Sequence, residues 1–234
     1  MTNYWLRIDL LSDTTFGNGD GVAGFIDVEV QHDEFGLPYL GGRTLKGMLS
    51  AASAEILFAL QLAGAPRLAT WQQCAQLLFG APGSGDEQAG NMHVGNAQLP
   101  GDLRALLREQ FLQPGNDLKR ENILSSLTSI RRQTAMEPES GAPKENTLRT
   151  IRVILHDTPF AARCDLLDQG ELAEEDILTY LAVCLKAFRR AGSERNRGKG
   201  RLVANLYDSD PFEDSSQPIT ETYFKRFAEE LVSA

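Results

Sequence analysis

The chain has few of the residues that build disulfide frameworks and metal centres. Its 234 residues include three cysteines and three histidines. Cys74, Cys164 and Cys184 are odd in number, far apart and set among apolar neighbours, which predicts buried free thiols rather than a disulfide framework. The histidines are scattered without the spacing of a ligand set, so we expect no structural zinc.

Long apolar runs are also scarce. No run approaches the roughly 18 residues of a membrane span, and the polar residues 1–3 lack the basic and apolar regions of a signal peptide. We therefore expect a cytoplasmic protein with no membrane partner. A hydrophobic content of 42% and a charged content of 24% are typical of a globular chain with a sizeable core. We expect one domain over residues 1–234.

Positive charge is scarce overall but unevenly distributed. The formal net charge is −9, which argues against a nucleic-acid partner. Residues 119–201, however, hold 15 of the 23 basic residues and 12 of the 32 acidic ones, a local balance of +3, while the remainder carries 8 basic and 20 acidic residues. One region can attract a polyanion while the rest repels it. A solvated, salt-bridged surface explains most such charge runs, but it explains loops rich in arginine and glycine less well.

The hydrophobic pattern predicts an alternation of strands and helices. Period-2 alternation predicts a strand over 4–11, and apolar steps of three and four predict helices over 44–63, 103–112 and 172–191. Shorter apolar runs predict extended segments at 25–31, 92–98, 151–155 and 160–167, with a hairpin or a bent strand across the last two, and a final strand ending near Tyr207. We expect residues 64–91 to be a loop-rich insertion, with a surface loop over 81–87, and residues 128–150 to leave the core as a second insertion.

The core order is therefore β-α-β-β-α-β, the ferredoxin-like arrangement of an α+β protein, whose sheet and loops often bind RNA. Fold alone does not give function. Two glycine-basic loops strengthen the case, because they flank the two core helices at 41–47 and 192–201. Both loops can approach one polyanion. They lack the paired aromatics that stack bases, which favours tracking of the RNA backbone over sequence readout.

The loop at 41–47 has the features of an anion site at the start of a helix. Glycines let the backbone approach a ligand, Thr44 is a candidate N-cap, and Arg43 and Lys46 add positive charge. A plain helix cap with two solvated cations is the alternative. No Ser or Thr follows Lys46 in the order of a nucleotide-binding P-loop, so nucleotide hydrolysis is disfavoured. In the second loop, glycines and arginines suit contact with phosphates. The predicted RNA contacts are Gly41, Gly42, Arg43, Thr44, Lys46, Arg131, Arg132, Arg149, Arg195, Arg197, Lys199 and Arg201.

These residues resemble the RAMP superfamily of CRISPR-associated proteins. The resemblance rests on Tyr39-Leu40-Gly41-Gly42-Arg43-Thr44-Leu45-Lys46-Gly47, on Leu78-Phe79-Gly80 and on Gly198-Lys199-Gly200-Arg201-Leu202. It is strongest to the repeated backbone subunit of type III effector complexes. The family's first motif usually reads Pro-Gly-Ser-Ser-Leu-Lys-Gly, so positions 41–44 are variants and positions 45–47 match.

The resemblance implies an antiviral ribonucleoprotein subunit that lies along a guide RNA and contacts other RAMP-type subunits. It implies that 128–150 is a thumb-like β-hairpin that displaces a base. It also implies that Asp27 cleaves the paired target RNA with Mg²⁺ or another divalent cation, because the family's aspartate stands similarly before Asp33 and 36–39. One carboxylate can hold a hydrated Mg²⁺ against a phosphate.

Alternatives remain at this site. Asp27 can be an ordinary polar residue on an exposed strand, because the apolar alternation around it departs from the family pattern; the subunit then binds and spaces RNA without chemistry. Other nearby carboxylates are candidates, and His32 can be a neighbouring acid or a turn residue. These carboxylates are Asp13, Asp20, Glu29 and Asp33. A third hypothesis, metal-independent processing of the guide precursor, requires a histidine near the RNA.

Overall fold

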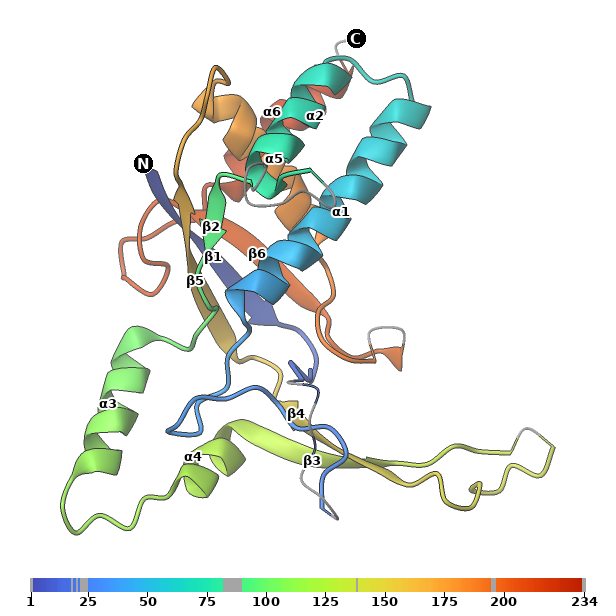
Figure 1. The fold of residues 1–234 in the computed structure, drawn as a ribbon, viewed down its shortest axis with the longest axis vertical. Helices are drawn as coiled ribbons and strands as arrows, with labels where there is room; N and C mark the ends of the chain where they lie inside the picture. Colours follow the sequence, from blue (N-terminus) through green and yellow to red (C-terminus); the bar gives the residue numbers. More distant parts are fainter. Residues whose placement is uncertain are drawn as a thin grey trace.

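The computed structural model describes residues 2–17, 19, 21, 25–81, 90–137, 139–194 and 197–232 (Figure 1). Within them the strands are β1 (Thr2–Leu10), β2 (Met92–Val94), β3 (Thr128–Gln133), β4 (Arg149–Ile154), β5 (Pro159–Leu166) and β6 (Leu202–Tyr207). The helices are α1 (Gly42–Leu62), α2 (Leu68–Phe79), α3 (Gly101–Leu112), α4 (Arg120–Leu127), α5 (Glu174–Ala187) and α6 (Thr220–Val232).

A four-stranded sheet in the order β2-β5-β1-β6 forms the centre of the molecule, and every neighbouring pair is antiparallel. Alternation in β1 explains how the sheet acquires two unlike faces. Leu6, Ile8 and Leu10 are buried on one face, whereas Arg7 and Asp9 form an ion pair on the other. The chain is thus a mixed α+β protein with antiparallel sheets, as predicted.

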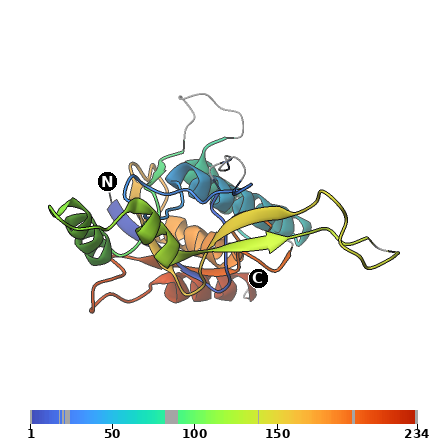
Figure 2. The same ribbon diagram turned by 90° about the horizontal axis from the view of Figure 1, so that it is seen from below.

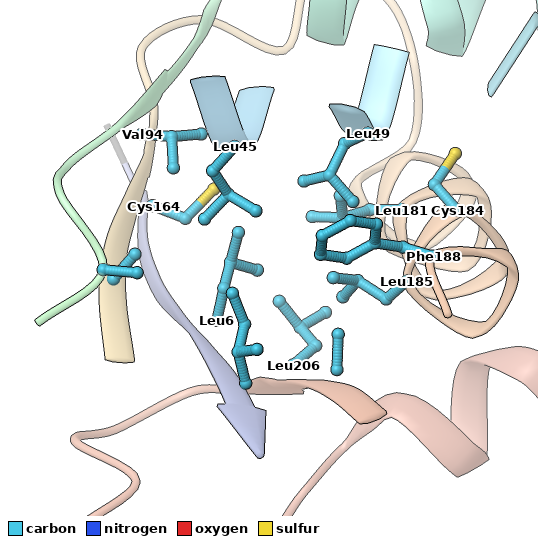
Figure 3. Packing of buried hydrophobic residues seen from close by; sticks show 14 of the residues in the cluster. Leu6, Leu45, Leu49, Val94, Cys164, Leu181, Cys184, Leu185, Phe188 and Leu206 are labelled. Carbon is cyan, nitrogen blue, oxygen red and sulfur yellow. The ribbon is translucent and has the colours of Figure 1, made fainter. Parts of the chain in front are cut away.

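Helices α1 and α5 cover the apolar face of this sheet. In Figure 3, Leu45 and Leu49 of α1 and Leu181 and Leu185 of α5 converge on Leu6 in the core, and all five side chains are buried. Burial of one leucine side chain stabilises the fold by about 1.5–3 kcal/mol. The predicted amphipathic faces of both helices are therefore the faces that contact the sheet.

The three cysteines are buried free thiols, as predicted. Burial raises the pKa of Cys74 and of Cys164 to about 12, and burial also raises the pKa of Cys184. The thiols therefore stay protonated at neutral pH and act as small apolar groups of the core.

Helix α2 lies within 64–91, which we expected to be loop-rich. Its Trp71 is 1% exposed, stacks on Tyr180 of α5 with ring centroids 6.1 Å apart, and meets Phe227 of α6 edge-on at 5.4 Å. Residues 68–79 thus belong to the helical layer of the core. Residues 82–89, which include most of the predicted surface loop, lie outside the described part of the chain.

Strands β3 and β4 form a separate antiparallel hairpin that projects from the rest of the molecule in both views (Figures 1 and 2). The pairing runs from Thr128–Ile154 to Gln133–Arg149. The possible hairpin between 151–155 and 160–167 is not formed, because β4 pairs with β3 whereas β5 pairs with β1 and β2. The intervening turn, with Asp157 at a φ of 63°, bends the chain from one sheet into the other.

Other predicted boundaries shift. Helix α1 begins at Gly42 with Gly41 as its N-cap and no side-chain capping bond, so Thr44 is not the cap. The extended segments at 25–31 and 92–98 form only isolated bridges and the short strand β2. Helix α5 is shorter than the predicted 172–191.

Helix α1 has the length and composition of a membrane-spanning helix, contrary to our expectation of no such run. It has 21 residues and a mean hydropathy of 1.2 in its most apolar window. This is weak evidence for a membrane, because a core helix of a soluble protein can have the same composition.

Candidate nucleic-acid interface

A cavity of 610 Å³ opens beside the hairpin, at the Gln133–Arg149 end of the β3–β4 ladder. Its lining brings together Asp27, Arg149 of β4 and Arg197 from the loop before β6, residues that are far apart in the sequence. The rest of the lining comes from the hairpin: Gln133, Thr134, Ala135, Asn146, Thr147 and Leu148. One predicted catalytic residue and two predicted RNA contacts thus share a single cavity.

Backbone pairing with β4 holds Asp27 in place. Its N–H donates to the carbonyl of Thr150 at 2.8 Å, and its Oδ2 accepts from the N–H of Thr150 at 2.6 Å. The side chain is exposed, and its Oδ1 has no partner among the described residues. Asp27 therefore has one structural carboxylate oxygen and one oxygen available to a ligand.

The competing carboxylates are engaged elsewhere. Asp13 accepts from Arg131 at 2.8 Å and lies 3.1 Å from Nδ1 of His156. Glu29 is buried against Arg152. Asp33 caps the turn at 35–37 and pairs with Arg108.

Asp20 lies outside the described residues. Nδ1 of His32 lies 2.9 Å from the carbonyl oxygen of Asp33, as suits the turn-residue alternative. None of the three histidines lines the cavity that holds Asp27.

The segment at 41–47 has more contacts with protein than we expected. The N–H of Gly42 donates to Oδ1 of Asn96 at 2.9 Å, and a Cβ on Gly42 would lie 2.1 Å from the carbonyl oxygen of Val94. The Lys46 ammonium donates to the carbonyl of Met92 at 2.7 Å, and burial lowers the pKa of Lys46. Gly42 and Lys46 therefore fasten α1 to β2.

Three residues of this segment, Arg43, Thr44 and Gly47, remain accessible. Arg43 and Thr44 are exposed, and no described residue bonds to the side chain of Arg43. A Cβ on Gly47 would meet nothing within 4 Å. A ligand at the start of α1 can therefore reach only part of the 41–47 motif.

The loop at 192–201 is tied to the segment that follows β1. Gly192 and Gly200 have φ values of 85° and 72°, and a Cβ on either one would come within 2.5 Å of Thr14 or Ala191. The N–H of Gly200 donates to the carbonyl of Asp13 at 3.1 Å. These glycines are therefore required by close packing of the backbone and by the left-handed conformation.

Charges in this loop are partly paired within the protein. Glu194 accepts from Lys199 at 2.7 Å and from Gln133 of the hairpin at 3.0 Å, and Arg197 lies 3.7 Å away. Burial raises the pKa of Glu194, but these hydrogen bonds and charges outweigh burial and leave the pKa lowered. Glu194 thus links the loop to the hairpin as an anion. Arg195 lies outside the described residues.

The arginines of the hairpin and of the loop differ in whether a protein carboxylate already pairs with them. Arg131 is held by Asp13, whereas Arg132 and Arg149 are exposed and have no bonded partner in the described parts of the chain. The same is true of the side chain of Arg201. Guanidinium groups without a carboxylate partner are therefore present both on the hairpin and at the end of the loop.

The two glycine-basic loops lie at opposite edges of the four-stranded sheet. Gly42 contacts the end of β2, Arg201 immediately precedes β6, and β2 and β6 are the outer strands. Three strand spacings separate these edges by about 14 Å. Contact with both loops therefore requires an extended ligand.

Sequence reasoning missed the polar residues through which the hairpin contributes to the cavity. Gln133, Asn146 and Thr147 line the cavity, and Asp13 connects the hairpin to the core. A high content of Thr, Asn and Gln beside the hairpin arginines was the available signal.

Comparisons with known proteins agree with this architecture. A family model described as the RAMP superfamily matches residues 7–203. No curated protein matches the sequence.

Among solved structures, a chain of the type III-B Cmr-beta complex bound to cognate target RNA superposes with a TM-score of 0.61 at 11% identity, covering 88% of this chain and 97% of that one. A chain of the apo Cmr-beta complex gives a TM-score of 0.60 at 13% identity with the same coverage. At these identities the likeness concerns the fold.

Proposed function

The chain belongs to the RAMP superfamily, and from this premise we propose that it is a backbone subunit of a type III CRISPR effector that binds guide RNA along its phosphates. Structural likeness to chains of the Cmr-beta complex supports this proposal. Its partners are then guide RNA, target RNA and other RAMP-type subunits, and its setting is a cytoplasmic antiviral ribonucleoprotein.

The finer fold assignment belongs to the same proposal. Along the chain the central elements follow the order β1-α1-β2-β5-α5-β6, and the sheet order is β2-β5-β1-β6. These orders support a ferredoxin-like core. The β3–β4 hairpin is then the thumb-like insertion, with strands that extend to Ile154 rather than ending at residue 150.

RNA binding would depend on arginines that protein carboxylates leave unpaired. Arg43, Arg132, Arg149 and Arg201 meet this condition among the described residues. Guanidinium groups bind phosphate oxygens through paired N–H donors. Lys46, with its carbonyl bonds, is assigned to positioning α1.

We further propose that Asp27 takes part in cleavage of the paired target RNA. A divalent ion bound there would polarise the scissile phosphate. One protein ligand is available to such an ion, because Oδ1 of Asp27 lies in a cavity large enough for a phosphate and waters. Mg²⁺ is often held by one or two carboxylates, with RNA and water completing its coordination shell. No group of three metal-ligating side chains exists among the described residues. Arg149 and Arg197 would hold the phosphates that flank the cut.

The observation that carries this proposal is the convergence of Asp27, Arg149 and Arg197 on one cavity. Asp27→Asn tests it sharply, because the amide oxygen can still accept from Thr150 while the negative charge is removed. In a reconstituted complex with Mg²⁺, the variant is expected to assemble and bind target RNA but to lose one cut in the guide-paired target. Unchanged cutting would contradict a catalytic role.

A subunit that binds RNA without chemistry is the second candidate, and one observation favours it. The Oδ2 atom of Asp27 already bonds to β4, which is a sufficient structural reason for an aspartate at this position. Comparison of Asp27→Ala with Asp27→Asn separates the two candidates. On the structural hypothesis only Asp27→Ala disturbs the hairpin around Thr150, and neither variant alters the cleavage pattern.

A further inference from the structure

A groove of 320 Å³ lies between α1 and α2. Helix α2 and the C-terminal half of α1 are at the top of the molecule in Figure 1, whereas the hairpin projects at the bottom. Among the described residues the lining has no charged side chain; it includes Ser50, Ala54 and Leu57 of α1 and Gln72, Gln76 and Phe79 of α2. The groove is therefore an apolar surface with amide groups at its α2 side.

The surface around the groove is also poor in charge. Residues 47–81 contain two charged residues, Glu55 and Arg67, and Arg67 is paired with carboxylates of α5 and α6. Phe58 and Leu62 are 63% and 74% exposed. Only 22% of the most apolar window of α1 is buried. An apolar helix that its own fold leaves largely uncovered is typical of an interaction surface.

The exposed face of α1 has two unlike rims. Ala54 lies on the rim beside the groove. Ala51, Glu55 and Leu62 repeat at steps of four and seven, so they form the rim farther from α2. Glu55 is exposed and has no bonded partner in the described ranges. A ligand that covers α1 would therefore meet an uncharged rim beside α2 and a negative charge on the other rim.

The walls of the groove restrict the secondary structure of an occupant. Both walls are α-helices, whose N–H and C=O groups are bonded within each helix. They offer no edge to which an extended peptide can add as a strand. An occupant must therefore satisfy its own backbone groups, as an α-helix does. Each wall contributes about two turns, 50–57 and 72–79, which suits apolar anchors at three- and four-residue steps.

Charge discriminates between possible occupants. An antiparallel two-fold pair of α1 helices would bring the same rim of both copies together, so the two Glu55 side chains would lie on one side and repel. Helices that lie on lipid carry basic residues beside their apolar face, and residues 47–66 have none. Residues 82–89, which follow α2, have no large apolar side chain to fill the groove.

We propose that this groove binds an amphipathic α-helix of another protein, with an uncharged apolar stripe between α1 and α2 and a basic residue on the flank that faces Glu55. The inference goes beyond the proposed function, because it assigns a protein partner to a surface at the other end of the molecule from the hairpin and does not depend on RNA binding.

A synthetic helical peptide tests the groove with the full chain. The peptide is longer than about 15 residues, so that it is helical in water. It has leucine at three- and four-residue steps, alanine and glutamine elsewhere, and one lysine on a flank of the leucine stripe. A second peptide has glutamate in place of the lysine. Fluorescence anisotropy is expected to show that the lysine peptide binds about 1.4- to 5-fold more tightly, the range of one exposed ion pair.

Variants of α1 separate the charge from the groove. Glu55→Lys is expected to reverse the preference between the two peptides, which a loss of structure would not do. Phe58→Gln is expected to weaken binding of both peptides about tenfold through the lost apolar contact. Ala54→Gln obstructs the groove at an exposed position and should also weaken both. Leu112→Gln on α3, at a side chain that is 69% exposed, is the matched control and should bind like the wild type.

No binding of either peptide, or equal affinities for the wild type and for the Phe58→Gln and Ala54→Gln chains, would overturn the inference. Sedimentation of the chain alone as a dimer that dissociates in the Phe58→Gln variant would identify a second copy as the occupant and overturn it. Binding to phosphatidylcholine vesicles that Phe58→Gln abolishes would identify a membrane surface and also overturn it. Each of these outcomes leaves the RNA-binding proposal standing, because that proposal is tested with RNA.

Discussion

Nε of Arg152 donates to Oε1 of Glu29 at 2.8 Å, and these side chains are only 13% and 9% exposed. Arg152 belongs to β4, and Glu29 lies two residues beyond Asp27. Oε1 of Glu29 also accepts from the N–H of Val30, and Arg152 donates to Oγ1 of Thr128. This buried pair therefore fixes the segment of Asp27 against the hairpin.

Replacement of Glu29 with Ala is expected to lower the free energy of unfolding by about 3–5 kcal/mol, because it leaves a buried guanidinium without its charge partner. Urea unfolding measures the change. Glu34→Gln, at an exposed position without a described partner, is the control and should stay within about 0.5 kcal/mol of the wild type. A small effect of Glu29→Ala would show that water replaces the pair.

Substitution of Gly42 and of Gly47 tests which glycine of the motif is needed for the fold and which is needed for a ligand. Gly42→Ala is expected to be destabilising, because its Cβ would lie 2.1 Å from the carbonyl oxygen of Val94. Gly47→Ala has free space and should stabilise α1 by about 1 kcal/mol. Thermal unfolding measures both changes. If Gly47 serves close approach of RNA, Gly47→Ala will also weaken RNA binding despite its gain in stability.

Arg149 provides the test of phosphate binding at the hairpin. Arg149→Gln is expected to reduce the affinity for single-stranded RNA and to lower the salt slope by about 0.7 for each lost phosphate contact. Arg163→Gln is the matched control, because Arg163 pairs with Asp165 at 2.7 Å on the sheet. Fluorescence anisotropy over a series of salt concentrations measures both variants. Equal slopes for the two variants would place Arg149 outside the RNA path.

The sequence predicts correctly those helices and strands whose buried face follows from their own hydrophobic pattern. Alternation in β1 and the apolar steps of α1 gave the correct structures, because each element's own period fixes its buried face. Helix α6 was missed although Tyr223, Phe227 and Leu231 repeat every four residues, so its signal was present in the sequence.

Long-range pairing could not be predicted in the same way. Residues 151–155 and 160–167 carry similar extended patterns, and only their register with β3 and β1 assigns them to different sheets. The meeting of Asp27 with Arg197 likewise depends on the packing of 192–201 against the segment after β1. The glycines of 41–42 predict space for a ligand, whereas the space at Gly42 is filled by the backbone at Val94.

The contacts of Asp13 give a pH-dependent prediction for the hairpin base. Burial raises the pKa of Asp13, but hydrogen bonds from Arg131 and His156 and the charge of Arg131 outweigh burial and hold the pKa below its ordinary value of 3.8. A carboxylate with a lowered pKa in the folded state stabilises the fold above the unfolded pKa, and this contribution is lost as the pH falls through the folded pKa. The chain with Asp13 and the Asp13→Asn variant should therefore differ in their free energy of unfolding by a constant amount near neutral pH. This difference should shrink below about pH 4.

The His156→Gln background isolates this effect. Nδ1 of His156 lies 3.1 Å from Asp13, and Nε2 lies 3.7 Å from Asp157, so the glutamine variant removes a second side chain that contacts the Asp13 carboxylate. Urea unfolding of both chains in this background, over a series of pH values, measures the difference. Because Asp13 joins Arg131 of β3 to the backbone of Gly200, loss of its charge should also increase amide hydrogen exchange in the hairpin more than in β1. A pH-independent difference, or equal exchange in both strands, would show that Asp13 does not attach the hairpin through its charge.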